Sequence, residues 1–120
     1  QLDLMGQENA ESTGTRQLSG VGGQMDFLEG AYRSKGGKGF ICINSSRVTK
    51  DGERKSNILA TIPGGSTISA PRTMIQYVAT EYGIASLSGK TLRERAEAMA
   101  SIAHPDFREE LMKYARENFK

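Results

Sequence analysis

The chain has 120 residues, a length that fits one compact domain with a real hydrophobic core. Its 16 basic and 14 acidic residues nearly balance, and no long basic block occurs, so nucleic acid and anionic membrane surfaces are not favoured as partners. No apolar run reaches the ~18 residues that a membrane span needs, and no N-terminal signal pattern is present. A hydrophobic fraction of 37% together with 14 glycines suggests many functional loops, or a piece of a larger protein.

A short strand, a long polar loop and a helix are predicted at the start of the chain. Residues 1–6 alternate in polarity and lack an initiating methionine, which is typical of a strand already under way in a fragment or processed piece. Residues 7–23 are polar and glycine-rich, and an ordered loop of this length in a compact domain usually has a function. The helix is expected over 26–33, with Phe27 and Leu28 on its apolar side.

Four further strands are predicted from apolar, β-branched or aromatic runs that end at turn residues. They span residues 40–44, 58–62, 67–69 and 75–80. The only cysteine, Cys42, lies in the first of these strands and is expected to be a buried thiol. A single cysteine excludes an internal disulfide framework and a cysteine-rich zinc site, and we expect a reducing, cytoplasmic setting.

The last third of the chain predicts two helices. Thr91 and Glu94 form a capping-box signature at the start of the first helix, and Pro105 fits the first turn of the second. The apolar face of the first helix consists of Leu92, Ala96, Met99 and Ala103, and that of the second of Phe107, Leu111 and Tyr114. Strands followed by a helical pair indicate an α/β fold in which the helices cover a central sheet.

The most informative motif is the run from Ser19 to Phe27, which places Gly20, Gly22 and Gly23 just before the predicted helix. Glycine lets a ligand approach the backbone closely, and a helix that starts here would direct free N–H groups at an anion or oxyanion. The spacing fits neither a dinucleotide fingerprint nor a Walker loop. A plain tight turn remains the alternative; otherwise the run is a backbone amide site suited to a thioester carbonyl or its oxyanion.

Other candidate residues are more simply explained as structural. His104, the only histidine, is expected to cap or pack, with a general base as the alternative, and no nucleophile elbow supports a serine–histidine–acid triad. Glu11 and Glu81 would suit a site only if desolvation raised their pKa values. Five basic residues flank the middle strands and either meet phosphates or form a solvated edge: Lys35, Lys38, Lys50, Arg54 and Lys55.

Five ordered blocks covering nearly the whole chain together resemble the C-terminal domain of the acetyl-CoA hydrolase/transferase family. They are Asp3-Leu4 with Gly6-Gln7 and Asn9-Ala10-Glu11-Ser12, then the segments 19–27, 80–85, 92–96 and 102–108. The Gly-Gly-Gln form of the glycine run is most similar to the 4-hydroxybutyrate and butyrate CoA-transferase branch. The succinyl-CoA:acetate branch tends to carry serine where Gln24 stands.

The resemblance implies that residues 1–120 form a single C-terminal domain of the CoA-transferase (NagB/RpiA-like) fold, within a larger two-domain enzyme. Such enzymes work by a ping-pong reaction through a glutamyl-CoA thioester. A backbone N–H of the glycine run, here of Gly22 or Gly23, helps to hold the oxyanion. Gly20, Gln24, Lys50 and Lys55 are weaker candidates for contacts with coenzyme A.

The resemblance also places the nucleophilic glutamate upstream of this chain, so the isolated domain is expected to be inactive. Its partners would be an acyl-CoA, a small carboxylate and the N-terminal domain, in a homo-oligomer. No metal and no bound cofactor are expected, because coenzyme A enters as a thioester substrate. Two alternatives stay open: an acetyl-CoA hydrolase of the same family, and a binding module without chemistry.

Overall fold

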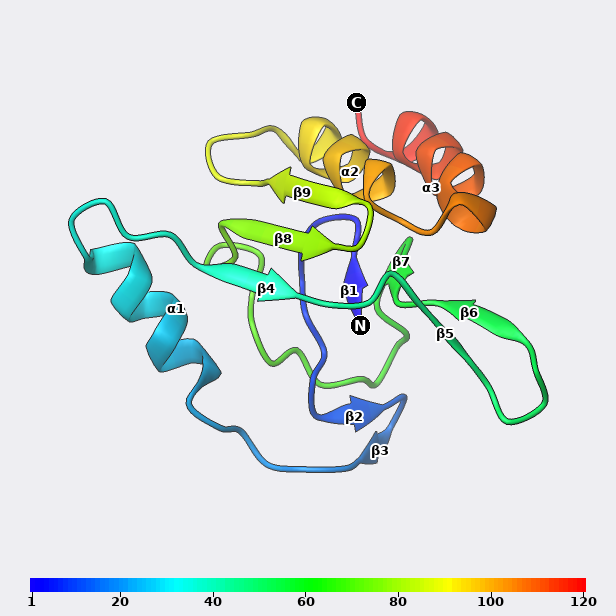
Figure 1. Ribbon diagram of the computed structural model, residues 1–120, viewed down its shortest axis with the longest axis horizontal. Helices are drawn as coiled ribbons and strands as arrows, with labels where there is room; N and C mark the ends of the chain where they lie inside the picture. The colour runs from blue at the N-terminus through cyan, green and yellow to red at the C-terminus, as the bar shows by residue number, and fades with distance from the viewer.

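The structure, a computed structural model that describes all residues 1–120, combines small β-sheets with a C-terminal pair of helices (Figure 1). The largest sheet has three strands in the order β4-β8-β9, with β4 parallel to β8 and β8 antiparallel to β9. These strands are β4 (Phe40–Cys42), β8 (Tyr77–Thr80) and β9 (Gly83–Ser86). Because β8 and β9 are joined by a two-residue turn, Thr80 pairs directly with Gly83.

Three two-stranded sheets complete the β structure. The N-terminal strand β1 pairs in parallel with β7, and two antiparallel hairpins are formed by β2 with β3 and by β5 with β6. The bounds are β1 (Leu2–Asp3), β2 (Ser12–Thr13), β3 (Arg16–Gln17), β5 (Ser46–Val48), β6 (Arg54–Ser56) and β7 (Ile58–Leu59).

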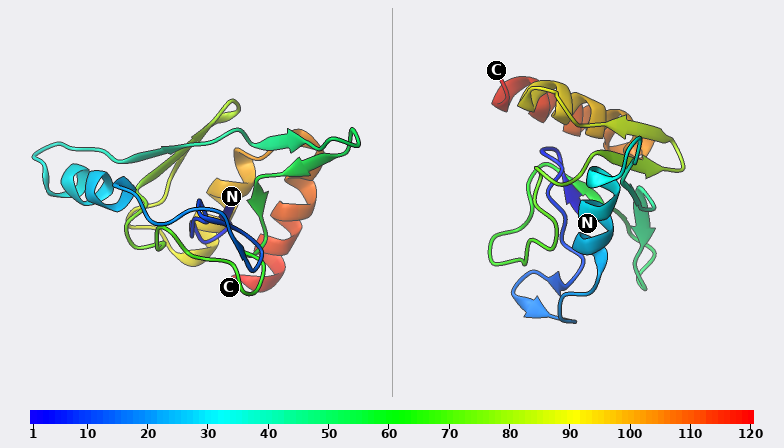
Figure 2. Two further views of the ribbon diagram at one scale, coloured as in Figure 1. Left: turned by 90° about the horizontal axis from the view of Figure 1, so that it is seen from below. Right: turned by 90° about the vertical axis from the view of Figure 1, so that its left-hand side faces the viewer.

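The helices are α1 (Gln24–Arg33), α2 (Leu92–Ser101) and α3 (Pro105–Asn118). The capping box and the helix-starting proline predicted in the last third of the sequence are both confirmed. Thr91 and Glu94 form the reciprocal hydrogen bonds of a capping box, and Pro105 occupies the first turn of α3. Helix α2 packs against β9 and α3, whereas α1 lies apart from this pair (Figure 2).

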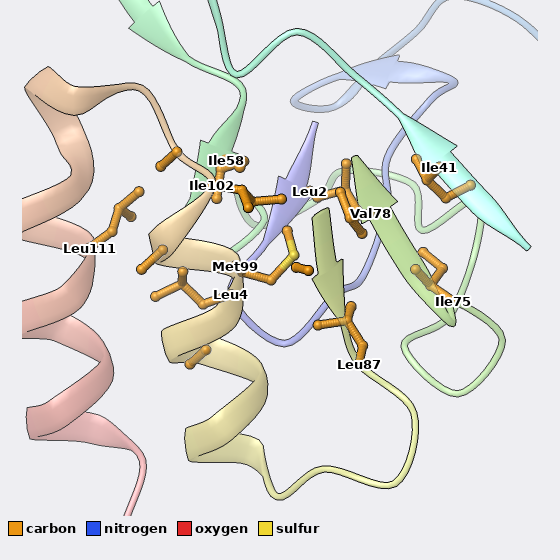
Figure 3. Close-up of a cluster of buried hydrophobic side chains, with 14 of the residues drawn as sticks. Leu2, Leu4, Ile41, Ile58, Ile75, Val78, Leu87, Met99, Ile102 and Leu111 are labelled. Carbon is orange, nitrogen blue, oxygen red and sulfur yellow. The ribbon is translucent and has the colours of Figure 1, made fainter. Parts of the chain in front are cut away.

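The core lies between the parallel strands, the three-stranded sheet and the inner faces of α2 and α3 (Figure 3). Leu2 and Ile58, paired across β1 and β7, are fully buried. Val78 on β8 and Met99 on α2 are also fully buried and join them in the same cluster. The predicted α/β class with a C-terminal helical pair is confirmed, but the sheet is divided into small pieces.

Several predicted strands differ from the observed ones because their partners come from distant parts of the chain. Residues 67–69 form no strand, because Thr67 donates its N–H to the Ser12 hydroxyl and Ser69 donates to the Glu8 carbonyl. The bond from Thr67 goes to a side chain and not to a backbone carbonyl. The segment therefore lacks the regular backbone hydrogen bonds of a strand pair. Strand β9 and the β2–β3 hairpin were not predicted from the sequence.

Three predictions of burial are wrong. Leu92, expected on the apolar face of the first C-terminal helix, is 41% exposed at the start of α2. Cys42 is exposed, because β4 is an edge strand on which only Ile41 turns inward. Phe27 is 81% exposed, and Leu28 is the only buried residue of α1. The apolar side of α1 is therefore narrower than its composition indicated.

Candidate functional site

The glycine run lies where the chain enters α1, as the sequence predicted. Gly23 is the N-cap residue and no side chain caps the helix. The N–H groups of residues 20–23 make no hydrogen bond within the chain, and the first N–H groups of a helix also lack helical partners. None of these glycines has positive φ, and a Cβ at Gly20 or Gly22 would meet nothing within 4 Å. The absence of side chains here thus leaves backbone donors open to a ligand.

A small hollow of about 180 Å³ is lined by this run. Gly20, Gly22 and Gln24 contribute to it, together with Glu11 from the preceding loop. Asn9 folds this loop: its side-chain oxygen accepts the N–H of Glu11 at 3.2 Å. The structure therefore places Glu11 beside the glycine run.

Sequence reasoning missed Glu8, a second buried carboxyl at this site besides Glu11. Glu8 is 6% exposed, and its Oε2 accepts a hydrogen bond from Nε2 of Gln24 at 2.8 Å. Burial raises the pKa of Glu8, and the hydrogen bond from Gln24 partly opposes that rise. The sequence gives no signal for its burial, because Glu8 stands in the polar segment 7–23 that was expected to be a loop.

A second, larger hollow of about 430 Å³ lies between α1 and β4. Glu8 and Gln24 line one part of it, and Phe27 and Phe40 another. Gln24 lines both hollows, so its side chain stands at the boundary between the glycine run and this more apolar space. The arrangement joins backbone donors, the Gln24 amide and the two buried carboxyls of Glu8 and Glu11 in a single region.

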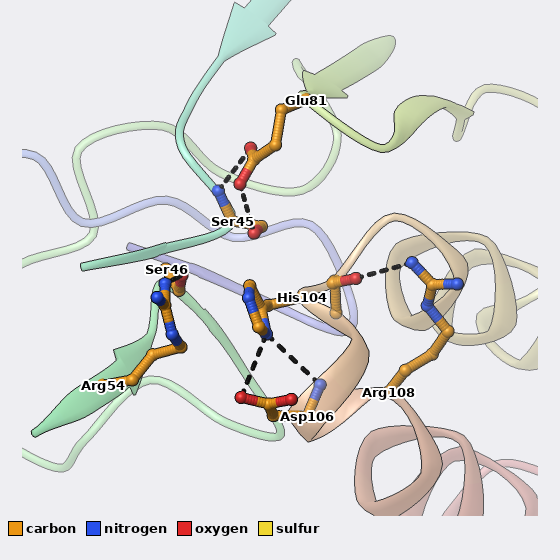
Figure 4. Close-up of polar contacts among 8 residues, drawn as sticks. Ser45, Ser46, Arg54, Glu81, His104, Asp106 and Arg108 are labelled. Atoms are coloured by element: carbon orange, nitrogen blue, oxygen red, sulfur yellow. Dashed lines mark hydrogen bonds and ion pairs between the residues drawn. The ribbon is translucent and has the colours of Figure 1, made fainter. Parts of the chain in front are cut away.

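A different polar cluster surrounds Glu81 (Figure 4). Ser45 donates its N–H and its hydroxyl to the Glu81 carboxylate, and these bonds lower the pKa of Glu81. The raised pKa that a catalytic role for Glu81 would require is therefore contradicted.

His104 does not form a triad with this serine and acid. Its Nδ1 accepts the Asp106 N–H at 3.2 Å, so it caps α3, as predicted. The Ser45 hydroxyl is directed to Glu81 rather than to the imidazole. A serine–histidine–acid triad is thereby excluded for these residues.

The predicted basic residues do not gather around the glycine run. Lys50 lies in the turn between β5 and β6, and Lys55 lies on β6 with its Nζ 3.4 Å from Glu53. This hairpin and α1 lie at opposite ends of the molecule (Figure 1; Figure 2). Lys38 alone of the predicted basic set lines the hollow beside α1. The contacts of Lys50 and Lys55 with coenzyme A stay a prediction.

No group of three or more histidine, cysteine, aspartate or glutamate side chains is placed to hold a metal ion. None of the three helices combines the length and the apolar character needed to cross a lipid bilayer.

Comparison with known proteins identifies the family. The sequence profile of the acetyl-CoA hydrolase/transferase C-terminal domain matches residues 1–115. The chain belongs to the acetyl-CoA hydrolase/transferase family. The expectation drawn from the five sequence blocks is confirmed.

Two CoA-transferases and one solved structure are similar to almost the whole chain. The 4-hydroxybutyrate coenzyme A transferase of Clostridium kluyveri is 50% identical over 99% of the chain, and the butyryl-CoA:acetate CoA-transferase of Anaerostipes caccae is 49% identical over 95%. The crystal structure of RipA from Yersinia pestis covers 98% of the chain with a TM-score of 0.83 and 40% identity. The chain spans about a quarter of each of these proteins: 27%, 26% and 26% of their lengths.

Proposed function

We propose that this chain is the C-terminal domain of a two-domain CoA-transferase that moves coenzyme A between an acyl-CoA and a small carboxylic acid. The activities named for the relatives support acetate, butyrate and 4-hydroxybutyrate as the substrate type. The single observation that carries the role of this domain is the run of unpaired backbone N–H groups at residues 20–23. Such donors suit the oxygen of a thioester carbonyl, on which negative charge develops during acyl transfer.

The proposed reaction divides the exchange into covalent steps. A glutamate carboxylate, supplied upstream of this chain, attacks the acyl-CoA carbonyl, and the C–S bond breaks as the CoA thiolate leaves. The thiolate then attacks the glutamyl carbonyl of the resulting anhydride, which releases the acyl group as a carboxylate and forms the glutamyl-CoA thioester. A second carboxylate reverses these steps and takes over the coenzyme A.

Each addition in this sequence passes through a tetrahedral oxyanion. An N–H of Gly22 or Gly23 would donate to that oxygen, and Gly20 and Gln24 would shape the space beside it. The site is open because a Cβ at Gly22 would meet no neighbour, so a flat thioester can approach the backbone. The donors are held before the reaction begins, which is what makes such stabilisation effective.

The same proposal includes the partners and the cellular setting of the domain. It would work with an N-terminal domain and as part of a homo-oligomer, and it would be inactive alone because the nucleophile lies elsewhere. Coenzyme A would enter as a substrate, without a separate cofactor. A cytoplasmic setting is proposed because the single cysteine forms no internal disulfide.

The test is Gly22→Val in the intact enzyme, with acyl-CoA:carboxylate exchange as the readout. A branched side chain at this position shields the N–H from the substrate, and we expect turnover to fall by about 10²-fold. Gly30→Val is the matched control, since Gly30 lies within α1, away from the candidate donors, and a Cβ there also meets nothing within 4 Å. Unchanged turnover in the Gly22 variant would reject the assignment.

The family description also includes hydrolases, in which water replaces the acceptor carboxylate. Product formation by the intact enzyme with and without acetate separates the two activities. A hydrolase releases free coenzyme A at the same rate in both cases, whereas a transferase requires the acceptor. Calorimetric titration of the isolated chain with coenzyme A tests the third alternative, because binding by the chain alone favours a module.

A further inference from the structure

One hydrogen bond connects the glycine run and α1 to the body of the protein. Among residues 20–33, the bond from Gln24 to Glu8 is the only hydrogen bond that reaches beyond the neighbouring Ser34. The remaining attachment of α1 is apolar: Leu28 is its only buried residue, and the half-buried Met25 packs against the same core. Helix α1 also lies apart from the helical pair at the other end of the core (Figure 2).

Glu8 is well placed to act as the fixed end of this connection. Its N–H donates to the Ala70 carbonyl at 3.0 Å, and its own carbonyl accepts the N–H of Ser69 at 2.7 Å. Its backbone also forms bridges with Leu2 and Ala70, so it is held between the N-terminal strand and the segment before β8. The backbone of Glu8 is therefore fixed by the strand β1 and the segment before β8, and not only by the loop that follows Glu8.

Gln24 is the other end of this connection. It is the first residue of α1 and directly follows the two candidate oxyanion donors. A helix N-terminus that no side chain caps has little else to fix the direction of its N–H groups. The orientation of these donors thus depends on where the Gln24 side chain is held.

Building on the proposed function, we infer that Glu8 is a positioning residue, which holds Gln24 and thereby keeps the backbone donors of Gly22 and Gly23 aligned with the acyl oxygen. Glu8 itself touches no reacting atom in this assignment. Displacement of catalytic groups by about 1 Å can cost on the order of 10²-fold in rate. A single hydrogen bond at this location can therefore matter more for turnover than for folding.

The experiment compares Glu8→Leu and Glu8→Gln in the intact enzyme. Leucine fills a similar volume but accepts no hydrogen bond, whereas glutamine keeps an oxygen that can accept from Gln24. We expect kcat of Glu8→Leu to fall by about 10-fold to 10²-fold with KM for the acyl-CoA little changed, because the lost alignment acts on the transition state. Glu8→Gln should recover most of the turnover.

Hydrogen exchange provides a readout that does not depend on activity. Peptides covering residues 20–28 should exchange faster in Glu8→Leu than in the wild type and regain protection in Glu8→Gln. The control is Glu29→Ala, which removes an exposed ion pair with Arg33 on the same helix. It should change neither kcat nor exchange in this segment.

Two results would overturn the positioning role: unchanged kcat in Glu8→Leu, or unchanged exchange of residues 20–28. Equal loss of turnover in both Glu8 variants would also overturn it, because the charge itself would then be acting. Failure of the underlying function shows separately, as normal turnover in Gly22→Val. Normal turnover in Gly22→Val would reject the glycine run as the oxyanion site. The hydrogen-exchange measurement on residues 20–28 would still decide whether Glu8 holds the start of α1.

Discussion

Ser45 donates both its backbone N–H and its hydroxyl to the carboxylate of Glu81, at 2.9 and 2.6 Å (Figure 4). The serine is fully buried, and the glutamate lies exposed in the turn between β8 and β9. The pair joins the segment after β4 to the turn after β8, at the same end of the sheet because the two strands are parallel. Both bonds favour the ionised carboxylate, so the pKa of Glu81 lies below its ordinary value.

Ser45→Ala should therefore raise the pKa of Glu81 toward the ordinary value, measured by NMR titration of its side chain. Because the folded pKa is lowered, the stabilisation from this pair is present above the ordinary carboxyl pKa and is lost as the pH falls through the lowered value. At pH 7 we expect the variant to lose about 1 kcal/mol of stability, since solvent around Glu81 screens the interaction. Ser66→Ala is the control, because the buried Ser66 hydroxyl has no hydrogen-bond partner. An unshifted Glu81 titration would contradict the prediction.

Local signals explain which parts of the fold could be predicted. The capping box at Thr91 and the proline at the start of α3 act within one helical turn, so the sequence contains all the information they need. The strands depend on distant partners: Ile41 pairs with Val78, and Leu2 with Ile58. Residues 67–69 have β-type composition but bind the loop of residues 8–12 instead, which no local pattern indicates.

The residues of the candidate site also fall into two groups: those that local sequence reveals and those that depend on distant partners. The glycine run could be recognised because its N–H groups and the helix that follows are adjacent in sequence. Glu8 could not, because its importance comes from a partner sixteen residues away and from burial by segments more distant still. The exposure of Cys42 was missed for a related reason: an apolar run does not reveal whether its strand lies at the edge of a sheet.

Arg95 should be the most sensitive charged residue of the fold. Its guanidinium is buried and donates to the carbonyls of Met5, Leu87 and Arg72 at 2.9, 2.8 and 2.7 Å. Arg95→Met leaves these three acceptors without their donor, and we expect a loss of about 3 kcal/mol or more in urea unfolding. Arg93→Met, which removes only an exposed pair with Glu97, should cost less than about 0.5 kcal/mol. Similar losses in the two variants would show that Arg95 does not hold these segments together.

Gly6 should resist replacement for two reasons that can be separated. Its φ is +86°, and a Cβ would lie 2.8 Å from Leu87 Cδ1 and 2.9 Å from Arg95 Nη2. Gly14 also has positive φ, at +56°, but a Cβ there meets nothing within 4 Å. Gly14→Ala should therefore cost about 1 kcal/mol from the backbone alone, and Gly6→Ala about 2 kcal/mol or more from backbone and contact together. Equal free energies of unfolding would mean that the neighbours of Gly6 move aside without cost.

The carboxyl of Glu8 should make stability depend on pH in the direction opposite to Glu81. Burial raises its folded-state pKa, so the folded protein holds this proton at a pH where the unfolded chain has released it. Between the two pKa values the stability contribution of Glu8 falls as the pH rises, and at neutral pH the ionised group disfavours folding. Glu8→Gln cannot ionise and keeps an acceptor for Gln24, so its Tm should exceed that of the wild type at pH 7.

This gain should shrink as the pH is lowered through the raised pKa of Glu8, and it should be smallest below the ordinary carboxyl pKa, where both states of the wild type are protonated. Calorimetric scans of both proteins from pH 4 to pH 8, at constant ionic strength, measure the difference. Glu53→Gln is the control for the change in net charge, because Glu53 lies on the exposed β5–β6 hairpin. A Tm difference that stays constant with pH would contradict the raised pKa, because only a group that titrates differently in the two states can produce the slope.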